Sequence, residues 1–265
     1  MDNTYSIQDK VAVVTGGSQS IGLAISKALV ARGAKVVIGD IVDAGAVETL
    51  NELAGGSVAA FVECDVTDPA ALRALIDHAV ARFGRLDILV NNAGILDKPH
   101  ALDPAGSHNR LCVDINVRSV IDGTGYALGI WESDEAARGV VVSMASAAGY
   151  VPTTIPVYSA TKAAVSMYTK ALGHLAPKVR VNAVAPTWVD TKLVDAEHIG
   201  RDHPTVRLLG LMEPAAIAGH VMRMIEDESM AGDVLIVENG KEPRLCTQPN
   251  SRDVLKALAG KVGAA

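Results

Sequence analysis

The stretch Lys10-Val-Ala-Val-Val-Thr-Gly-Gly-Ser-Gln-Ser-Ile-Gly22 joins a short apolar run to a glycine-rich turn. An unbroken apolar run of this length is typical of a strand buried on both faces of a parallel sheet. An amphipathic stretch over 23–32 follows, Gly33 is its expected end, and a second apolar run over 35–39 ends at Asp40. This order of strand, glycine turn, helix, strand and acid predicts a dinucleotide-binding unit, in which the start of the helix receives the pyrophosphate.

Asp40 decides which dinucleotide we expect. It stands where a carboxylate would accept a hydrogen bond from the 2′-hydroxyl of an adenosine ribose. The same carboxylate would repel the 2′-phosphate of NADP. The sequence therefore predicts NAD as the cofactor.

The alternation of apolar strands and helices continues along the chain. We expect further strands over 57–64, 86–90, 139–144, 179–185 and 234–237, and further helices around 50–53, 70–83, 111–130, 158–175 and 214–226. Such alternation implies a parallel sheet with right-handed crossovers. The predicted fold is therefore α/β, a Rossmann-type doubly wound, seven-stranded parallel sheet with helices on both faces. We expect one domain over 1–265. Within it, residues 97–109 should be irregular, and a substrate loop should lie at about 187–213, irregular over 192–213. The tail over 241–265 is less patterned.

Composition excludes several classes of partner. The 265 residues carry 24 Lys and Arg against 30 Asp and Glu, without a basic run, which argues against nucleic acid and anionic membranes. No stretch of eighteen apolar residues occurs, and the N-terminus has no signal-peptide pattern. Three cysteines without metal or redox spacing favour a reducing, cytoplasmic location, and the seven histidines show no metal spacing, so no metal site is expected.

Tyr158 and Lys162 carry the strongest indication of chemistry. They are four residues apart in a helical stretch, so their side chains share one face of the helix. A fixed ammonium beside a phenol favours the phenolate and moves the pKa of the tyrosine toward the working pH. Ser146 lies twelve residues earlier, at the end of an expected strand, where its hydroxyl could hold a carbonyl or alcohol oxygen. Ser143, on the same strand, is the alternative.

Several motifs occur together in a fixed order. They are Thr15 to Gly22, Asn91-Asn-Ala-Gly94, Ser146, Tyr158-x-x-x-Lys162 and Asn182-Ala-Val-Ala-Pro186. Over residues 8–240 this pattern resembles the short-chain dehydrogenase/reductase family. Within the family, Gly84-Arg-Leu-Asp-Ile-Leu-Val90 and Glu213-Pro-x-x-Ile-Ala218 are similar to the NAD-dependent 15-hydroxyprostaglandin dehydrogenase type.

The resemblance implies roles for single residues. Tyr158 would be the catalytic acid/base, Lys162 would lower its pKa and bind the nicotinamide ribose, Ser146 would position the substrate oxygen, and Asn116 would support a proton-relay water. The implied cofactor-binding residues are Gly16, Ser18, Gln19, Ser20, Ile21, Gly22, Asp40, Ile41, Asp65, Val66, Asn92, Ala93, Gly94, Tyr158, Lys162, Pro186, Thr187, Val189 and Thr191. Ser146, Tyr158 and Trp188 would line the substrate pocket. The helices around 111–130 and 158–175 would pair subunits in a homodimer or homotetramer.

The chain departs from the family pattern at a few positions. Ser20 replaces a turn glycine, which costs about 1 kcal/mol if φ is positive there, although its hydroxyl could instead donate to a phosphate. Thr187 replaces a frequent glycine and would narrow the nicotinamide side of the pocket. His198 and His203, at the substrate loop, are expected to be solvated.

Two functions remain as hypotheses. The first is an NAD(H)-dependent oxidoreductase that interconverts a secondary alcohol and a ketone by Tyr/Lys/Ser/Asn acid–base catalysis. The segments 95–109, 150–157 and 187–213 should line its pocket, and their apolar composition favours a cyclic, terpenoid, steroid-like or aromatic substrate. The alternative is a non-catalytic NAD-binding sensor or scaffold that retains the fold.

Overall fold

The computed structural model describes residues 4–99, 102–151, 153–195 and 200–262. Its strands form one sheet in the order β3-β2-β1-β4-β5-β6-β7-β8. The bounds are β1 Val11–Thr15, β2 Lys35–Asp40, β3 Ala59–Glu63, β4 Ile88–Asn91, β5 Gly139–Met144, β6 Val179–Pro186, β7 Val234–Val237 and β8 Arg244–Leu245. The strands β1 to β7 pair in parallel, and β8 pairs antiparallel to β7. The doubly wound α/β fold is confirmed, with one short strand more than the seven expected.

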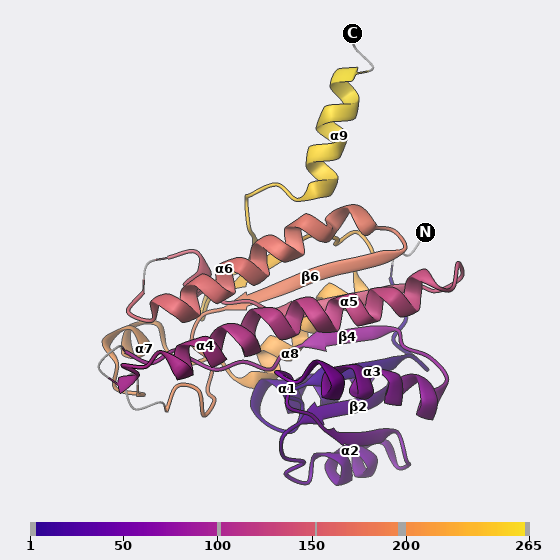
Figure 1. Cartoon of the computed structure of the whole chain (residues 1–265), viewed down its shortest axis with the longest axis horizontal. Coiled ribbons are helices and arrows are strands. Elements are labelled where there is room, and N and C mark those ends of the chain that lie inside the picture. Colours follow the sequence, from indigo (N-terminus) through magenta and orange to yellow (C-terminus); the bar gives the residue numbers. More distant parts are fainter. Residues whose placement is uncertain (1–3, 100–101, 152, 196–199, 263–265) are drawn as a thin grey trace.

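Helices cover both faces of the sheet (Figure 1). Their bounds are α1 Ser20–Val30, α2 Ala46–Ala54, α3 Pro69–Phe83, α4 Ser107–Val113, α5 Ser119–Glu132, α6 Pro156–Ala171, α7 Pro204–Leu209, α8 Pro214–Glu226 and α9 Ser251–Val262. Alternate residues of β1 pack into different cores: Ala12 and Val14 join α1 and α8, whereas Val11 and Val13 join α3 and α5. A strand buried on both faces needs apolar side chains at every position, and this explains its unbroken apolar run.

The segments expected to be irregular contain short elements. The helix α4 begins at Ser107, inside 97–109, and α7 lies inside the substrate loop, with Pro204 at its first position. These helices span seven and six residues, too short for a helical period to show in the sequence. The long helix expected over 111–130 is interrupted by a π-helical turn, Asp114–Arg118, between α4 and α5.

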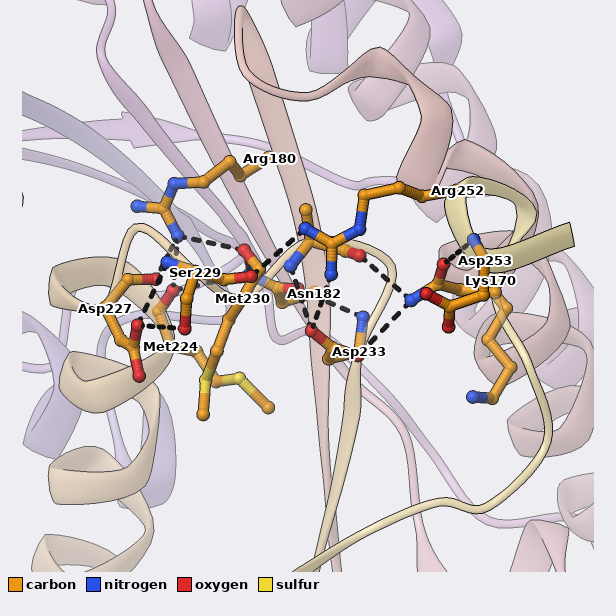
Figure 2. Close-up of polar contacts among 12 residues, drawn as sticks. Lys170, Arg180, Asn182, Met224, Asp227, Ser229, Met230, Asp233, Arg252 and Asp253 are labelled. Atoms are coloured by element: carbon orange, nitrogen blue, oxygen red, sulfur yellow. Dashed lines mark hydrogen bonds and ion pairs between the residues drawn. The ribbon is translucent and has the colours of Figure 1, made fainter. Parts of the chain in front are cut away.

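The tail over 241–265 is also ordered where the structure describes it. After β8, Lys170 of α6 donates from Nζ to the carbonyl oxygen of Gln248 at 2.5 Å. The buried Asn250 donates to Asp233 Oδ1 at 3.3 Å. Arg252 lies 3.9 Å from the same carboxylate (Figure 2). From this anchor α9 extends away from the rest of the molecule (Figure 1).

Hydrogen bonds to the end of α8 and to the segment before β7 hold the amino-terminal half of β6. Arg180 donates to the main-chain oxygens of Met224 and Asp227 at the end of α8 (Figure 2). Asn182 donates to Met230 O at 3.0 Å and accepts from the N–H of Asp233 at 3.2 Å. The asparagine of the Asn182 to Pro186 motif therefore stabilises the packing of β6, far along the strand from Pro186.

None of the helices in the described ranges is long and apolar enough to cross a membrane.

Candidate active site

A cavity of about 590 Å³ lies at the carboxyl ends of β4, β5 and β6. Ligands of doubly wound folds bind at this edge, beside the point where the strand order reverses, here between β1 and β4. The predicted residues in the cavity wall are Ile21, Asn92, Gly94, Ser146, Tyr158, Lys162, Pro186, Thr187, Trp188, Val189 and Thr191. The structure thus brings together residues that lie more than 160 positions apart in the sequence.

Tyr158 and Lys162 are neighbours on α6, and both are buried. The Nζ atom of Lys162 lies 5.5 Å from the centroid of the Tyr158 ring and donates to the carbonyl oxygen of Met144 at 2.6 Å. That carbonyl is at the end of β5. Lys162 therefore holds α6 against the sheet while its charge faces the phenol.

The pKa of Tyr158 differs from the one that the spacing predicts. The pKa is raised to about 12, mainly by burial and also by the nearby Cys112 and Asp97, while a hydrogen bond with Ser146 acts in the opposite direction. Burial also lowers the pKa of Lys162 to about 8. The sequence predicts that Lys162 moves the pKa of Tyr158 toward neutral pH. In the protein without cofactor this prediction is wrong, because burial penalises the charged form of both side chains.

Ser146 and Ser143 lie in different environments. Ser146 Oγ accepts from the N–H of Ala148 at 3.2 Å, which caps the short 3₁₀ turn after β5, and the side chain lines the cavity. Ser143 lies inside the sheet, where its hydroxyl accepts from Asn91 at 3.3 Å. Of the two, only Ser146 can reach a substrate in the cavity.

Asn116 occupies the π-helical turn but is absent from the cavity wall. Its amide donates to the main-chain oxygen of Ile95 at 2.9 Å and accepts from the Ile95 N–H at 3.0 Å. A Cβ placed on Gly94 would lie 3.3 Å from Asn116 Oδ1 and 3.5 Å from Lys162 Nζ. Asn116 thus fixes the segment after β4 close to Lys162, and π-helical turns of this kind often occur at functional sites.

The glycine turn fits a dinucleotide phosphate. Gly16 has φ +61°, and a Cβ on Gly22 would collide with the carbonyl oxygen of Gly16, so both positions require glycine. Asn92 Nδ2 holds the turn through the Gly16 oxygen at 2.9 Å. Ser20 has φ +51°, so the conformational cost expected for a serine there applies.

Two buried hydroxyls near the turn and in the cavity also fit a polar ligand. Among the described residues, Ser18 Oγ and Thr187 Oγ1 have no hydrogen-bond partner. Buried hydroxyls are rarely left unpaired, because desolvation without a partner costs free energy. A nicotinamide dinucleotide, which carries phosphate and carboxamide groups, would provide such partners.

The remaining predicted cofactor residues follow the carboxyl ends of neighbouring strands. Asp40 ends β2, and its two carboxylate oxygens accept from the N–H groups of Ser18 at 3.1 Å and Ile41 at 2.8 Å. Asp65 follows β3 and accepts from the N–H of Thr67 at 2.9 Å. The others are Gln19 and Ser20 after β1, Val66 after β3, and Ala93 after β4. Together they trace a path along β3, β2, β1 and β4 toward the cavity.

The substrate side of the cavity contains residues that the sequence did not assign. His203 lines it, with its ring centroid 6.1 Å from that of Trp188, and it is half-buried there rather than fully exposed. Its Nδ1 accepts from the N–H of Thr205 at 3.3 Å at the start of α7, and the following Pro204 was the available sequence signal for that helix start. His198 lies outside the described residues.

Apolar side chains form much of the wall. Besides Trp188 they include Leu96, Val151, Ile155, Leu193, Val194 and Leu209.

Among the described residues, no group of three or more His, Cys, Asp or Glu side chains could hold a metal ion.

Comparisons with known proteins place this geometry in context. The model of the short chain dehydrogenase family matches residues 10–201. The chain is 32% identical over 255 residues to human 15-hydroxyprostaglandin dehydrogenase [NAD(+)], covering 89% of this chain and 93% of that protein. It is 36% identical over 236 residues to the 3-alpha-(or 20-beta)-hydroxysteroid dehydrogenase of Mycobacterium tuberculosis, covering 87% and 88%.

Solved structures agree with the fold. The 3-ketoacyl-(acyl-carrier-protein) reductase from Brucella melitensis, complexed with NADH, superposes with a TM-score of 0.78 at 31% identity, covering 89% of this chain and 99% of that one. A short chain dehydrogenase from Burkholderia cenocepacia, in complex with NADP, gives a TM-score of 0.77 at 30% identity with the same coverage.

Proposed function

The chain belongs to the short-chain dehydrogenase family, and from this premise we propose that it is an NAD(H)-dependent oxidoreductase that interconverts a secondary alcohol and a ketone. The observation that carries the proposal is the buried pair of Tyr158 and Lys162 in one cavity wall with Ser146. A phenol, an ammonium and a hydroxyl together can hold a substrate oxygen and move its proton.

NAD is the proposed cofactor because of Asp40. A 2′-phosphate would bring negative charge against this carboxylate, whereas a ribose hydroxyl could donate to it. The residues that would hold the dinucleotide are those of the glycine turn, Asp40, the segment after β4, and the cavity residues Lys162 and Thr187. When bound, the cofactor supplies the hydride acceptor or donor.

The side chains would share the proton chemistry. In alcohol oxidation the Tyr158 oxygen accepts the hydroxyl proton, and in ketone reduction it donates the proton to the carbonyl oxygen. Ser146 would hold that oxygen in place. Lys162, whose pKa is about 8, is largely protonated at neutral pH, and its charge, 5.5 Å from the centroid of the Tyr158 ring, would favour the phenolate. Asn116 would keep the segment after β4 beside Lys162 and support a proton-relay water.

The cavity supports an apolar substrate. Its aliphatic and aromatic wall can bury a cyclic, terpenoid, steroid-like or aromatic alcohol, and a volume of about 590 Å³ lies within the range of pockets that hold molecules of that size. The names of the hydroxysteroid and hydroxyprostaglandin relatives agree with this substrate class.

We also propose a cytoplasmic homodimer or homotetramer. Ile121 on α5 and Met167 on α6 are exposed apolar residues on the two helices expected to pair subunits. The three cysteines are free thiols, which favours a reducing compartment. Size-exclusion chromatography with light scattering tests the assembly, and a monomer at micromolar concentration would contradict it.

The experiment that tests the function follows the absorbance of reduced nicotinamide. Purified protein is mixed with NAD or NADP and a panel of secondary alcohols at mildly alkaline pH. We expect turnover of apolar alcohols with NAD, little with NADP, and loss of turnover in Tyr158→Phe by about 10²–10⁴-fold. Turnover of sugars or charged hydroxy acids only would contradict the substrate class. NAD binding without turnover across the panel would favour the alternative, a non-catalytic sensor or scaffold.

A further inference from the structure

Asp97 is a buried carboxylate in the segment after β4, and 2% of its surface is exposed. Its Oδ2 accepts from the N–H of Val157 at 2.9 Å, in the first turn of α6. Pro156 has no N–H, and Ile155, at the N-cap position, has no side-chain acceptor. Asp97 therefore caps the helix of Tyr158 from a segment 60 residues earlier in the chain.

The second oxygen of Asp97 is not explained by capping. Asp97 Oδ1 is buried and has no hydrogen-bond partner in the part of the chain that the structure describes. The neighbouring Leu96 and Ile155 belong to an apolar cluster that also contains Cys112 and Tyr158. Capping needs one acceptor, which a neutral side chain could supply without burying an unpaired carboxylate oxygen. This arrangement suggests that the charge itself has a role.

The groups that face Tyr158 come from four segments. Lys162 lies on α6, Ser146 follows β5, Cys112 lies on α4, and Asp97 follows β4. Burial raises the pKa of Cys112 to about 11, so this thiol is neutral at pH 7. Asp97 is therefore the negative charge in this set, and it opposes Lys162 in its effect on the phenol.

We propose that Asp97 is a positioning residue, whose buried carboxylate fixes the start of the Tyr158 helix at Val157 and places a negative charge near the phenol. The inference rests on the proposed function, in which Tyr158 exchanges a proton with the substrate. By opposing the phenolate, Asp97 keeps the phenol protonated to higher pH. This favours proton donation to a ketone over proton removal from an alcohol.

The matched pair of variants is Asp97→Asn and Asp68→Asn. Asparagine at 97 keeps an acceptor for the Val157 N–H and removes the charge. Asp68 Oδ1 accepts from the N–H of Ala70 at 2.8 Å in the first turn of α3, a helix that also begins with a proline. Asp68→Asn therefore makes the same chemical change at an exposed helix cap, whose carboxylate is not among the charges that act on Tyr158.

The first measurement is the pH profile of alcohol oxidation. We expect Asp97→Asn to move the acid limb to lower pH by about one pH unit, which makes oxidation about tenfold faster on that limb. Asp68→Asn should retain the wild-type profile. Superimposable profiles for Asp97→Asn and wild type, or equal movements in both variants, would overturn the proposal.

The second set of measurements does not depend on turnover. Tyrosinate absorbance is titrated without cofactor, over the pH range where circular dichroism remains native, and Tyr158→Phe identifies the signal of Tyr158. Asp97→Asn should ionise Tyr158 at lower pH. Asp97→Ala, which removes the cap, should speed hydrogen exchange at the start of α6. If wild type turns over no alcohol, the proposed function fails while these two measurements still decide the role of Asp97; unchanged titration or exchange would refute it.

Discussion

The Nζ atom of Lys162 lies 5.5 Å from the centroid of the Tyr158 ring, and both side chains are buried. This pairing links the chemistry of the site to the stability of the fold. Burial lowers the pKa of Lys162 from 10.5 to about 8. Between these values the unfolded chain binds a proton that the folded protein has released, so this residue makes the free energy of unfolding rise with pH.

The Lys162→Met variant tests this linkage. Lys162→Met should remove the part of the rise in the free energy of unfolding with pH that Lys162 causes, which is up to about 3 kcal/mol between pH 8 and pH 10. Buried thiols with raised pKa values oppose it above pH 9, so the informative quantity is wild type minus variant. Urea unfolding at several pH values gives this difference. A difference that does not change with pH would show that Lys162 keeps its proton in the folded protein.

Asp40 should determine the choice between NAD and NADP. In Asp40→Asn we expect weaker NAD binding and stronger NADP binding, with a change of about tenfold in their ratio, because the repelling charge is lost. Dissociation constants can be measured by intrinsic fluorescence, since Trp188 lines the cavity. Asp43→Asn is the control, because Asp43 lies in the same loop and its carboxylate, among the described residues, accepts only a weak 3.4 Å contact from the N–H of Val47. An unchanged ratio in Asp40→Asn would remove the basis for predicting NAD.

Ser20→Gly should stabilise the protein by about 1 kcal/mol, because serine at φ +51° is strained and glycine is not. Ala44→Gly, at φ +53° and outside the glycine turn, relieves similar strain and is the control. Thermal unfolding gives both stabilities, and titration with NAD gives the affinity. If the Ser20 hydroxyl donates to a phosphate, only Ser20→Gly will weaken NAD binding. No gain in stability would contradict the strain.

Asn250 should anchor the tail without affecting the site. Its amide donates to Ala231 O at 3.1 Å and to Asp233, and it accepts from the N–H of Asp253 at 3.0 Å. Asn250→Ala leaves these buried groups unpaired, so we expect a loss of about 1–3 kcal/mol in the free energy of unfolding and faster proteolysis of α9. Gln248→Ala, in the same tail segment, is the control because the residue is exposed and Lys170 donates to its main-chain oxygen. Equal stabilities would show that the tail is held elsewhere.

The sequence by itself determined the core of the fold. Apolar runs identified the seven parallel strands, because most of these strands are buried along their length, although β3 at the edge of the sheet is fully buried only at Ala59. The glycine turn followed from backbone sterics at Gly16 and Gly22, and the spacing of Tyr158 and Lys162 followed from the helical period. These features depend on residues close together in the chain, so local pattern is sufficient to predict them.

Only the tertiary structure decided the rest. It placed Ser146 in the cavity and Ser143 in the sheet, brought His203 against Trp188, and set Asp97 on the helix of Tyr158. It also raised the pKa of Tyr158, which helical spacing alone had predicted to fall. These contacts join segments far apart in sequence, and burial depends on everything packed around a group. Neither the contacts between distant segments nor the burial of a group leaves a local periodicity in the sequence from which it could be predicted.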